Sequence, residues 1–186
     1  MIRDDEWLVV VDRQQVFAQS DWSTWAVPDG AFYTTDGPYS RLADAFGERA
    51  LYTKYVSPVP PTGSWVDYFK DWPDFEVSPD DPMFDFTPDT AERAEGHPVV
   101  VRDVFSKWCP EMQAIVGAGG WMTVCGVATD FCVLQTCLAA ADDGMHVRVA
   151  SDACAGTSPE NHQRALDLMA LYAPLITVED TSSILQ

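Results

Sequence analysis

Short apolar runs recur along this chain, and segments with apolar residues at helical spacing separate many of them. The runs are short and rich in branched residues, as is typical of strands buried on both faces. They cover Trp7–Val11, Ala50–Tyr55, Val99–Val101, Trp121–Cys125, His146–Ala150 and Leu175–Val178. This alternation predicts a six-stranded, mainly parallel, Rossmann-like sheet in a three-layer α/β/α fold.

The predicted helices have recognisable ends. Gly47 and Gly117 are placed to end two of them, and Ser106 and Ser158 are placed to cap the amino ends of two. Pro159 suits the first position of the last long helix. We therefore expect helices over Tyr39–Phe46, from Ser106 to Val116, over Val133–Ala141 and from Ser158 to about Tyr172.

Residues 57–98 have a different character. Most of the thirteen prolines fall there, among many aromatic residues. Prolines at this density exclude a long regular element, although Trp65 to Trp72 can form about two helical turns. A long aromatic loop in a compact domain is usually a binding wall or an oligomer contact, and both interpretations stay open. We expect one domain over residues 1–186, with this segment inserted as a loop.

Composition and charge limit the possible partners. The chain has 186 residues, is 47% hydrophobic and carries a formal net charge of −18, which argues against binding nucleic acid or an anionic membrane. No apolar run approaches membrane-spanning length, and the amino terminus does not resemble a signal peptide. The five cysteines are an odd number and include no Cys-x-x-Cys pair, so we expect reduced thiols in a cytoplasmic protein.

Three chemically capable residues follow predicted strands. Asp12 comes after the first strand, Arg102 after the third and Cys132 after the fourth. Because the carboxyl ends of parallel strands share one edge of the sheet, these side chains are expected to converge. A carboxylate beside a thiol can take its proton, and a nearby cation stabilises the thiolate. Plainer interpretations stay open, since Asp12 also suits a turn and most buried cysteines are inert.

The residues around Asp12 and Cys132 resemble motifs of the isochorismatase-like cysteine hydrolases, which include nicotinamidases and N-carbamoylsarcosine amidohydrolases. The first stretch is Val9-Val10-Val11-Asp12-Arg13-Gln14-Gln15-Val16-Phe17, and the second is Gly126-Val127-Ala128-Thr129-Asp130-Phe131-Cys132-Val133. The resemblance extends over about residues 7 to 180. It implies that Cys132 is a nucleophile and Asp12 a general base. It also implies a cis peptide before Ala128, with the backbone N–H groups of Ala128 and Cys132 forming an oxyanion hole.

Two departures from the family pattern concern charge and metal. The residue aligned with the family's catalytic lysine is Arg102, which keeps the positive charge but has a planar, bulkier head group. Lys107 is the alternative cation, although a lysine at a helix start is more often a surface residue. Nicotinamidases hold a metal with histidines after the second strand, and the region from Tyr52 to Trp72 has no histidine. We therefore expect neither a metal nor another cofactor.

These features predict a metal-independent hydrolase that cleaves a C–N bond in a small amide or carbamoyl compound. The candidate pocket residues are aromatic, namely Phe17, Trp22, Trp65, Phe105, Trp108 and Phe131. Two alternatives stay open: a vinyl-ether hydrolase of the isochorismatase type, and a non-catalytic relative whose old site is closed by Arg102. We expect a homo-oligomer, because residues 57–98 offer an aromatic contact surface.

Overall fold

A computed structural model describes residues 1–19, 25–28 and 30–186. Its centre is a six-stranded parallel sheet with the strand order β3-β2-β1-β4-β5-β6. The strands are β1 (Trp7–Val11), β2 (Ala50–Tyr55), β3 (Val99–Arg102), β4 (Trp121–Val127), β5 (His146–Ala155) and β6 (Ile176–Glu179). The order reverses between β1 and β4, and such a switch point is where open α/β sheets build their sites.

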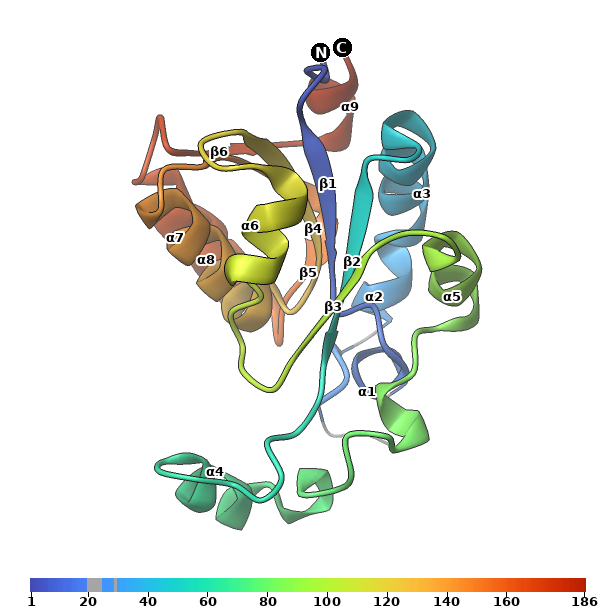
Figure 1. The fold of residues 1–186 in the computed structure, drawn as a ribbon, viewed down its shortest axis with the longest axis vertical. Helices are drawn as coiled ribbons and strands as arrows, with labels where there is room; N and C mark the ends of the chain where they lie inside the picture. Colours follow the sequence, from blue (N-terminus) through green and yellow to red (C-terminus); the bar gives the residue numbers. More distant parts are fainter. Residues whose placement is uncertain (20–24, 29) are drawn as a thin grey trace.

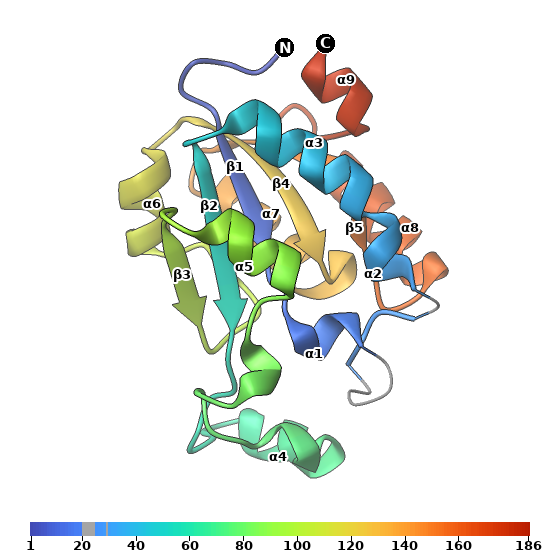
Figure 2. The same ribbon diagram turned by 90° about the vertical axis from the view of Figure 1, so that its right-hand side faces the viewer.

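Helices cover both faces of the sheet, so the predicted three-layer α/β/α fold is confirmed (Figures 1 and 2). On one face lie α6 (Pro110–Val116), α7 (Leu134–Asp142) and α8 (Pro159–Ala170). On the other lie α2 (Ala31–Thr34), α3 (Asp36–Phe46) and α5 (Pro88–Ala94), and α9 (Thr181–Leu185) packs against α3. Among the described residues, no helix is both long and apolar enough to cross a membrane.

The central strands are apolar because both of their faces are covered. Residues 8–11 of β1 and 122–127 of β4 are fully buried, as the unbroken apolar runs predicted. At the junction of these strands, Gly126 has φ +115°, and a Cβ there would lie 2.1 Å from the carbonyl oxygen of Val11. Only glycine allows β1 and β4 to approach this closely beside the two candidate catalytic residues.

Several predicted boundaries differ by a few residues in the structure, and two of them bear on the site. The helix predicted from Ser106 begins instead at Pro110, with Cys109 in an extended conformation before it. Pro110 suits the first position of the helix. Residues 106–109 before it are therefore not helical. Strand β5 runs past Ala150 to Ala155, with a register shift against β4 between Val124 and Gly126. Polar residues in its second half hide that extension in the sequence.

Residues 57–98 contain more regular structure than their prolines suggest. They form α4 (Trp65–Asp71), two 3₁₀ turns, η1 (Pro73–Phe75) and η2 (Pro82–Phe84), and α5. Figure 2 shows α4 beyond the carboxyl ends of the strands, past the arrowhead of β2. This segment is joined to the sheet by an antiparallel bridge between Gln14, just before α1 (Gln15–Ala18), and Phe86. It therefore lies beside the switch point and can form a wall there.

Candidate active site

Asp12 lies in the turn directly after β1 and is fully buried. Its φ of +47° is in the left-handed region, which only tight local contacts hold for a residue other than glycine. Thr53 on β2 supplies such contacts: its hydroxyl donates to Asp12 Oδ1 at 2.6 Å and accepts the Asp12 backbone N–H at 3.2 Å. The carboxylate is thus fixed at the edge of the sheet.

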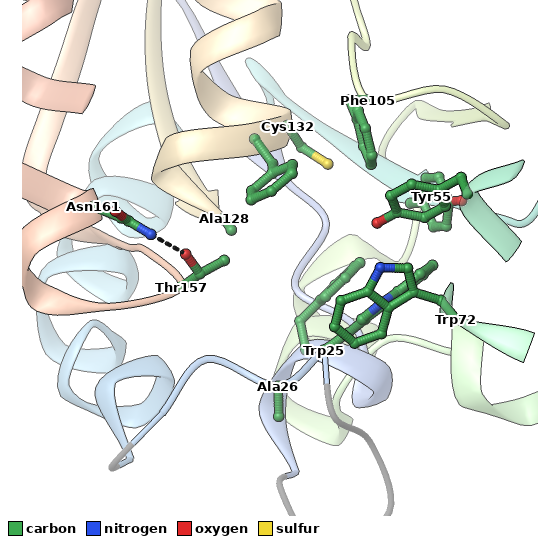
Figure 3. A pocket seen from close by; sticks show the side chains of 12 residues that line it. Trp25, Ala26, Tyr55, Trp72, Phe105, Ala128, Cys132, Thr157 and Asn161 are labelled. Carbon is green, nitrogen blue, oxygen red and sulfur yellow. Dashed lines mark hydrogen bonds between the residues drawn. The ribbon is translucent and has the colours of Figure 1, made fainter. Parts of the chain in front are cut away.

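Cys132 follows β4 on a single wide helical turn, Thr129–Val133, that leads into α7. Only 3% of the residue is exposed, yet it lines a cavity. Figure 3 shows its sulfur directed toward the space bordered by Phe105 and Tyr55. The thiol is therefore shielded from bulk water but open to a bound molecule.

Lys107 is the cation that meets Asp12. Its Nζ lies 3.0 Å from Asp12 Oδ2, and both side chains are fully buried. The ammonium also donates to the carbonyl oxygen of Val104 at 2.9 Å and lies 5.0 Å from the ring centre of Tyr55. A buried ammonium is stable only with such partners, so these contacts define one position for the charge.

A single hydroxyl links Lys107 to the nucleophile turn. The side chain of Thr136 on α7 accepts the Lys107 backbone N–H at 2.9 Å and donates to the carbonyl oxygen of Cys132 at 2.6 Å. Thr136 is fully buried. The segment carrying the cation and the turn carrying the thiol are consequently held in register with each other.

Lys107, rather than the expected Arg102, forms the ion pair with Asp12. Arg102 ends β3, the edge strand, and pairs with Tyr55 of β2. Strand β2 therefore separates Arg102 from β1, a distance of about 10 Å at normal strand spacing. The chain then turns back over the strand ends and brings Lys107, the less favoured alternative, to Asp12.

The electrostatics around Cys132 favour a resting thiol. Burial, followed by the negative charge of Asp12, raises the pKa of Cys132 well above its ordinary value. The ammonium of Lys107 and the backbone N–H of Ala128 act in the opposite direction and lower that pKa. The proton thus stays on sulfur until a base removes it, and Asp12 is the neighbouring base.

The backbone beside Cys132 offers a hydrogen-bond donor to a reacting oxygen. The Val127–Ala128 peptide bond is cis. The Ala128 N–H lowers the pKa of Cys132, and Ala128 lines the same cavity. A donor in this position faces the atoms on which negative charge develops when sulfur attacks a carbonyl carbon.

The cavity in front of Cys132 has a volume of about 320 Å³ and a largely aromatic lining (Figure 3). That size suits a small molecule. Its lining residues are Phe17, Trp25, Ala26, Tyr55, Tyr68, Trp72, Phe105, Ala128, Phe131, Cys132, Thr157 and Asn161.

Three of the six predicted pocket residues, Phe17, Phe105 and Phe131, line the cavity. Trp65 lies behind it, with its ring centre 5.2 Å from that of Phe105. The prediction for Trp108 is wrong, because its indole N–H donates to Asp143 Oδ2 at 3.0 Å on α7's side of the sheet. Trp22 falls outside the described residues.

Sequence reasoning missed several lining residues, Tyr55 most clearly. Tyr55 ends β2, so the rule that selected Asp12 and Cys132 from strand ends could have found it. Gln14 fixes this residue: its side chain accepts the Tyr55 N–H at 2.8 Å and donates to the carbonyl oxygens of Tyr55 at 2.8 Å and Phe84 at 2.6 Å. Trp25, Tyr68 and Trp72 carried no signal beyond their aromatic character.

A polar corner lies at one side of the cavity. Asp130 accepts hydrogen bonds from the backbone and the hydroxyl of Thr157, and Asn161 Nδ2 donates to the Thr157 hydroxyl at 3.0 Å. His162 Nδ1 lies 2.8 Å from Thr129 Oγ1, and burial lowers the pKa of His162. These side chains largely satisfy one another, and of them only Thr157 and Asn161 line the cavity.

The described side chains do not form a cluster of metal ligands. Among the described residues, no three His, Cys, Asp or Glu side chains gather in a way that could hold a metal ion. At the end of β2, the residues beside the cavity are Tyr55 and Val56. Neither of these side chains is a good ligand for a divalent metal.

The comparisons with known proteins agree with this architecture. The family model of the isochorismatase domain matches residues 6–180. The chain belongs to the isochorismatase family. This is a family of hydrolases, and the resemblance found around Asp12 and Cys132 is thereby confirmed.

Solved structures of isochorismatase relatives share the fold at low sequence identity. A cysteine hydrolase from Pseudomonas syringae pv. phaseolicola 1448A has a TM-score of 0.79 at 17% identity, over 97% of this chain and 91% of that one. An isochorismatase family protein from Desulfovibrio vulgaris scores 0.77 at 20% identity, over 97% and 96%. A zinc complex of pyrazinamidase from Pyrococcus horikoshii scores 0.72 at 23% identity, over 95% and 99%. Comparison with curated proteins gives no match.

Proposed function

We propose that this isochorismatase-family protein is a cysteine-dependent hydrolase that cleaves a C–N bond in a small, neutral amide or carbamoyl compound. Cys132 is the nucleophile, Asp12 the general base and acid, and Lys107 the resident cation. The proposal takes residues 1–186 as one hydrolase domain, located in the cytoplasm and assembled as a homo-oligomer.

One observation carries this proposal: the fully buried Asp12–Lys107 pair, 3.0 Å between Oδ2 and Nζ, lies beside the Cys132 thiol. Removing two charges from water is unfavourable, so a buried pair next to a nucleophile in a cavity suggests a use for it. It also supports activity in a chain with Arg102 at the third strand end, because Lys107 offers a positive charge at Asp12.

The reaction follows from these positions. Asp12 takes the proton from Cys132 as the sulfur attacks the carbonyl carbon, and the carbonyl oxygen becomes an oxyanion that accepts a hydrogen bond from the Ala128 N–H. When this tetrahedral intermediate collapses, the C–N bond breaks, and the proton on Asp12 moves to the leaving nitrogen. The products of this half-reaction are ammonia or an amine and a thioester on Cys132.

Hydrolysis of the thioester repeats the steps with water. Asp12 removes a proton from a water molecule, whose oxygen attacks the thioester carbon, and the C–S bond breaks. The sulfur recovers a proton from Asp12, and an acid leaves the cavity. Lys107 remains protonated throughout and stabilises the carboxylate whenever Asp12 is ionised.

The lining supports a neutral substrate. None of the described residues that line the cavity is Lys, Arg, Asp or Glu, and the ammonium of Lys107 is already paired. A carboxylate on the substrate would therefore lose its hydration without gaining a partner. This counts against the vinyl-ether alternative for any substrate that carries carboxylate groups.

The test is ammonia release from a panel of small carboxamides and carbamoyl compounds, with mass spectrometry of the quenched protein. Wild-type protein should release ammonia and show a mass increase on Cys132 equal to the acyl group. Cys132→Ala should do neither. Turnover that survives in Cys132→Ala would overturn the thioester route in favour of ether-type hydrolysis. Absence of turnover across the panel, with Cys132 no more reactive toward iodoacetamide than the other thiols, would favour the non-catalytic alternative.

A further inference from the structure

The cation of the site is carried by a stretch of chain that has no regular structure of its own. Residues 103–109, the Lys107 segment, form neither helix nor strand between β3 and α6. The Lys107 ammonium donates to the carbonyl oxygen of Val104 in the same segment at 2.9 Å. The charge therefore moves with this segment, and the contacts that hold the segment also set the distance between the charge and Asp12.

The Lys107 segment is attached to α7 at two points. Thr136, in the first turn of α7, accepts the Lys107 backbone N–H at 2.9 Å. Directly after the last residue of α7, Asp143 Oδ2 accepts the indole N–H of Trp108 at 3.0 Å. The turn that carries Cys132 leads into the same helix. The cation and the thiol consequently share one support.

The Thr136 hydroxyl uses both of its hydrogen-bonding functions to join the two. Its proton is donated to the carbonyl oxygen of Cys132 at 2.6 Å, so its oxygen is the acceptor for Lys107. Thr136 is fully buried, as is Lys107, so bulk water does not replace the hydroxyl. Without it the buried Lys107 N–H loses its partner, and a shift of the segment that satisfies this N–H again becomes favourable.

We propose that Thr136 is a positioning residue that keeps the Lys107 ammonium beside Asp12 by anchoring the Lys107 segment to the nucleophile turn. Its effect on turnover rests on the proposed function, whereas its effect on the position of the ammonium does not. Thr136 does not line the cavity. It therefore acts through Lys107 and does not touch the substrate.

Chemical labelling of lysine reports the position of the ammonium without any turnover. Lys107 is fully buried in its ion pair, whereas the side chain of Lys70 is 67% exposed and gives a reference rate within the same protein. Thr136→Val keeps the shape of the side chain and removes the hydroxyl. Reductive methylation with formaldehyde and a borane, followed by peptide mapping, should show Lys107 modified about tenfold faster than in wild type, relative to Lys70. Thr136→Ser keeps the hydroxyl and should label as wild type does.

Steady-state kinetics separate a positioning role from a general loss of stability. On any compound that releases ammonia, Thr136→Val should lower kcat about tenfold and leave KM unchanged, because the substrate contacts are intact. Thr136→Ser should restore kcat. In a Lys107→Met background Thr136→Val should have no further effect, since no ammonium is left to position.

Thr123 on β4 offers a matched control. It is likewise fully buried, and its hydroxyl donates to Glu6 Oε1 at 2.7 Å, at the other end of the sheet. Thr123→Val should lower stability in urea denaturation, yet leave the labelling of Lys107 and kcat as in wild type. If Thr136→Val does not fold, Thr136→Ala removes the same hydroxyl with a smaller side chain and gives the same two readouts.

The proposal is overturned if Lys107 labels as slowly without the Thr136 hydroxyl as with it, or if Thr136→Ser labels as fast as Thr136→Val. Equal exposure of Lys107 in Thr123→Val would reduce the effect to lost stability. A fall in kcat that persists in the Lys107→Met background would mean that Thr136 acts on something other than the cation. Faster labelling of Lys107 in a protein that turns over no compound of the panel would refute the proposed function and leave the role of Thr136 in placing the ammonium intact.

Discussion

The sheet carries a buried ion pair at each end, and the two pairs are built differently. At the amino end Glu6 pairs with Arg148, with Oε1 and Nε 3.0 Å apart. At the carboxyl end Asp12 pairs with Lys107 at the same separation. Both carboxylates are fully buried. The difference between the pairs lies in what else surrounds each carboxylate.

Glu6 is fully satisfied. Its Oε1 also accepts the Thr123 hydroxyl at 2.7 Å, and its Oε2 accepts the Arg3 backbone N–H at 3.1 Å. Asp12 is satisfied on one side only: Oδ1 accepts from Thr53, whereas Oδ2 has its ion pair but no hydrogen bond of normal geometry. The first pair is closed and serves the fold. The second is open beside a thiol and a cavity, as a proton acceptor must be.

Breaking the closed pair should have the largest effect on stability. Arg148→Met leaves the buried Glu6 with only the partly exposed Arg3 guanidinium, 3.7 Å away, as a cation, so the free energy of unfolding should fall by about 3–5 kcal/mol. Urea denaturation measures this, and the rate of Cys132 alkylation in the folded fraction should not change. A loss below about 1 kcal/mol would show that Glu6 is served well enough by its other partners.

Breaking the open pair should act on turnover. Lys107→Met removes the cation that stabilises the Asp12 carboxylate and the thiolate, and kcat/KM should fall about 10²–10³-fold. Arg102→Met is the matched control, because Arg102 ends β3 and is not the partner of Asp12. Its kcat/KM should stay within about threefold of wild type. A larger loss in Arg102→Met than in Lys107→Met would return the cation role to Arg102.

Asp12→Asn should abolish hydrolysis but increase the rate at which Cys132 is alkylated. The Asp12 charge raises the pKa of Cys132 and Lys107 lowers it, so removing the carboxylate should lower that pKa. Iodoacetamide should then label Cys132 faster at pH 7.5 even though hydrolysis is lost. Stopped-flow labelling followed by peptide mapping gives the rate. Slower labelling would mean that Asp12 already holds the thiol proton in the resting protein.

Alkaline pH should lower the free energy of unfolding, and each buried cysteine thiol should contribute a smaller loss than the ion-pair variant Arg148→Met. Burial raises the pKa of Cys125 to about 12, and it also raises the pKa values of Cys132, Cys137 and Cys154. Below pH 9 the thiols are protonated in both states. Above it the unfolded chain releases protons that the folded chain retains, so stability falls by about 1.4 kcal/mol per pH unit for each group.

Urea titrations at pH 8 and pH 10 measure this dependence. Cys132→Ser should reduce the dependence of the free energy of unfolding on pH by the contribution of one thiol. The difference from wild type measures the thiol beside Asp12 separately from the thiols in the core. Equal stability at both pH values would contradict the burial of these thiols.

The local pattern of apolar residues was sufficient to predict the bounds of the strands that are buried on both faces. Strands β1 and β2 have the predicted bounds, because covered parallel strands are continuous apolar runs. Ser158 accepts from the Asn161 N–H and Pro159 opens α8, as their residue types predict. In contrast, α5 has no counterpart among the predicted helices, because the density of prolines in residues 57–98 argues against helix, although Pro88 occupies a helix start.

Some residues of the candidate site could likewise be predicted from local pattern, and others could not. Asp12 and Cys132 follow strands directly, so topology places them at one edge. Lys107 lies in a segment without regular structure, and its path is set by long-range contacts such as the hydrogen bond to Thr136. Trp108, next to it in sequence, turns away to Asp143. No periodicity encodes which of two neighbouring side chains in such a segment faces inward.

The placement of Lys107 in a loop bears on how divergent relatives are judged. A loop of five residues reaches at most about 17 Å, more than the two strand spacings between the end of β3 and β1. A charge carried on such a loop can change its position in the alignment without changing its position in space. Relatives that lack lysine at the third strand end should be classed as inactive only after this reach has been searched for another one.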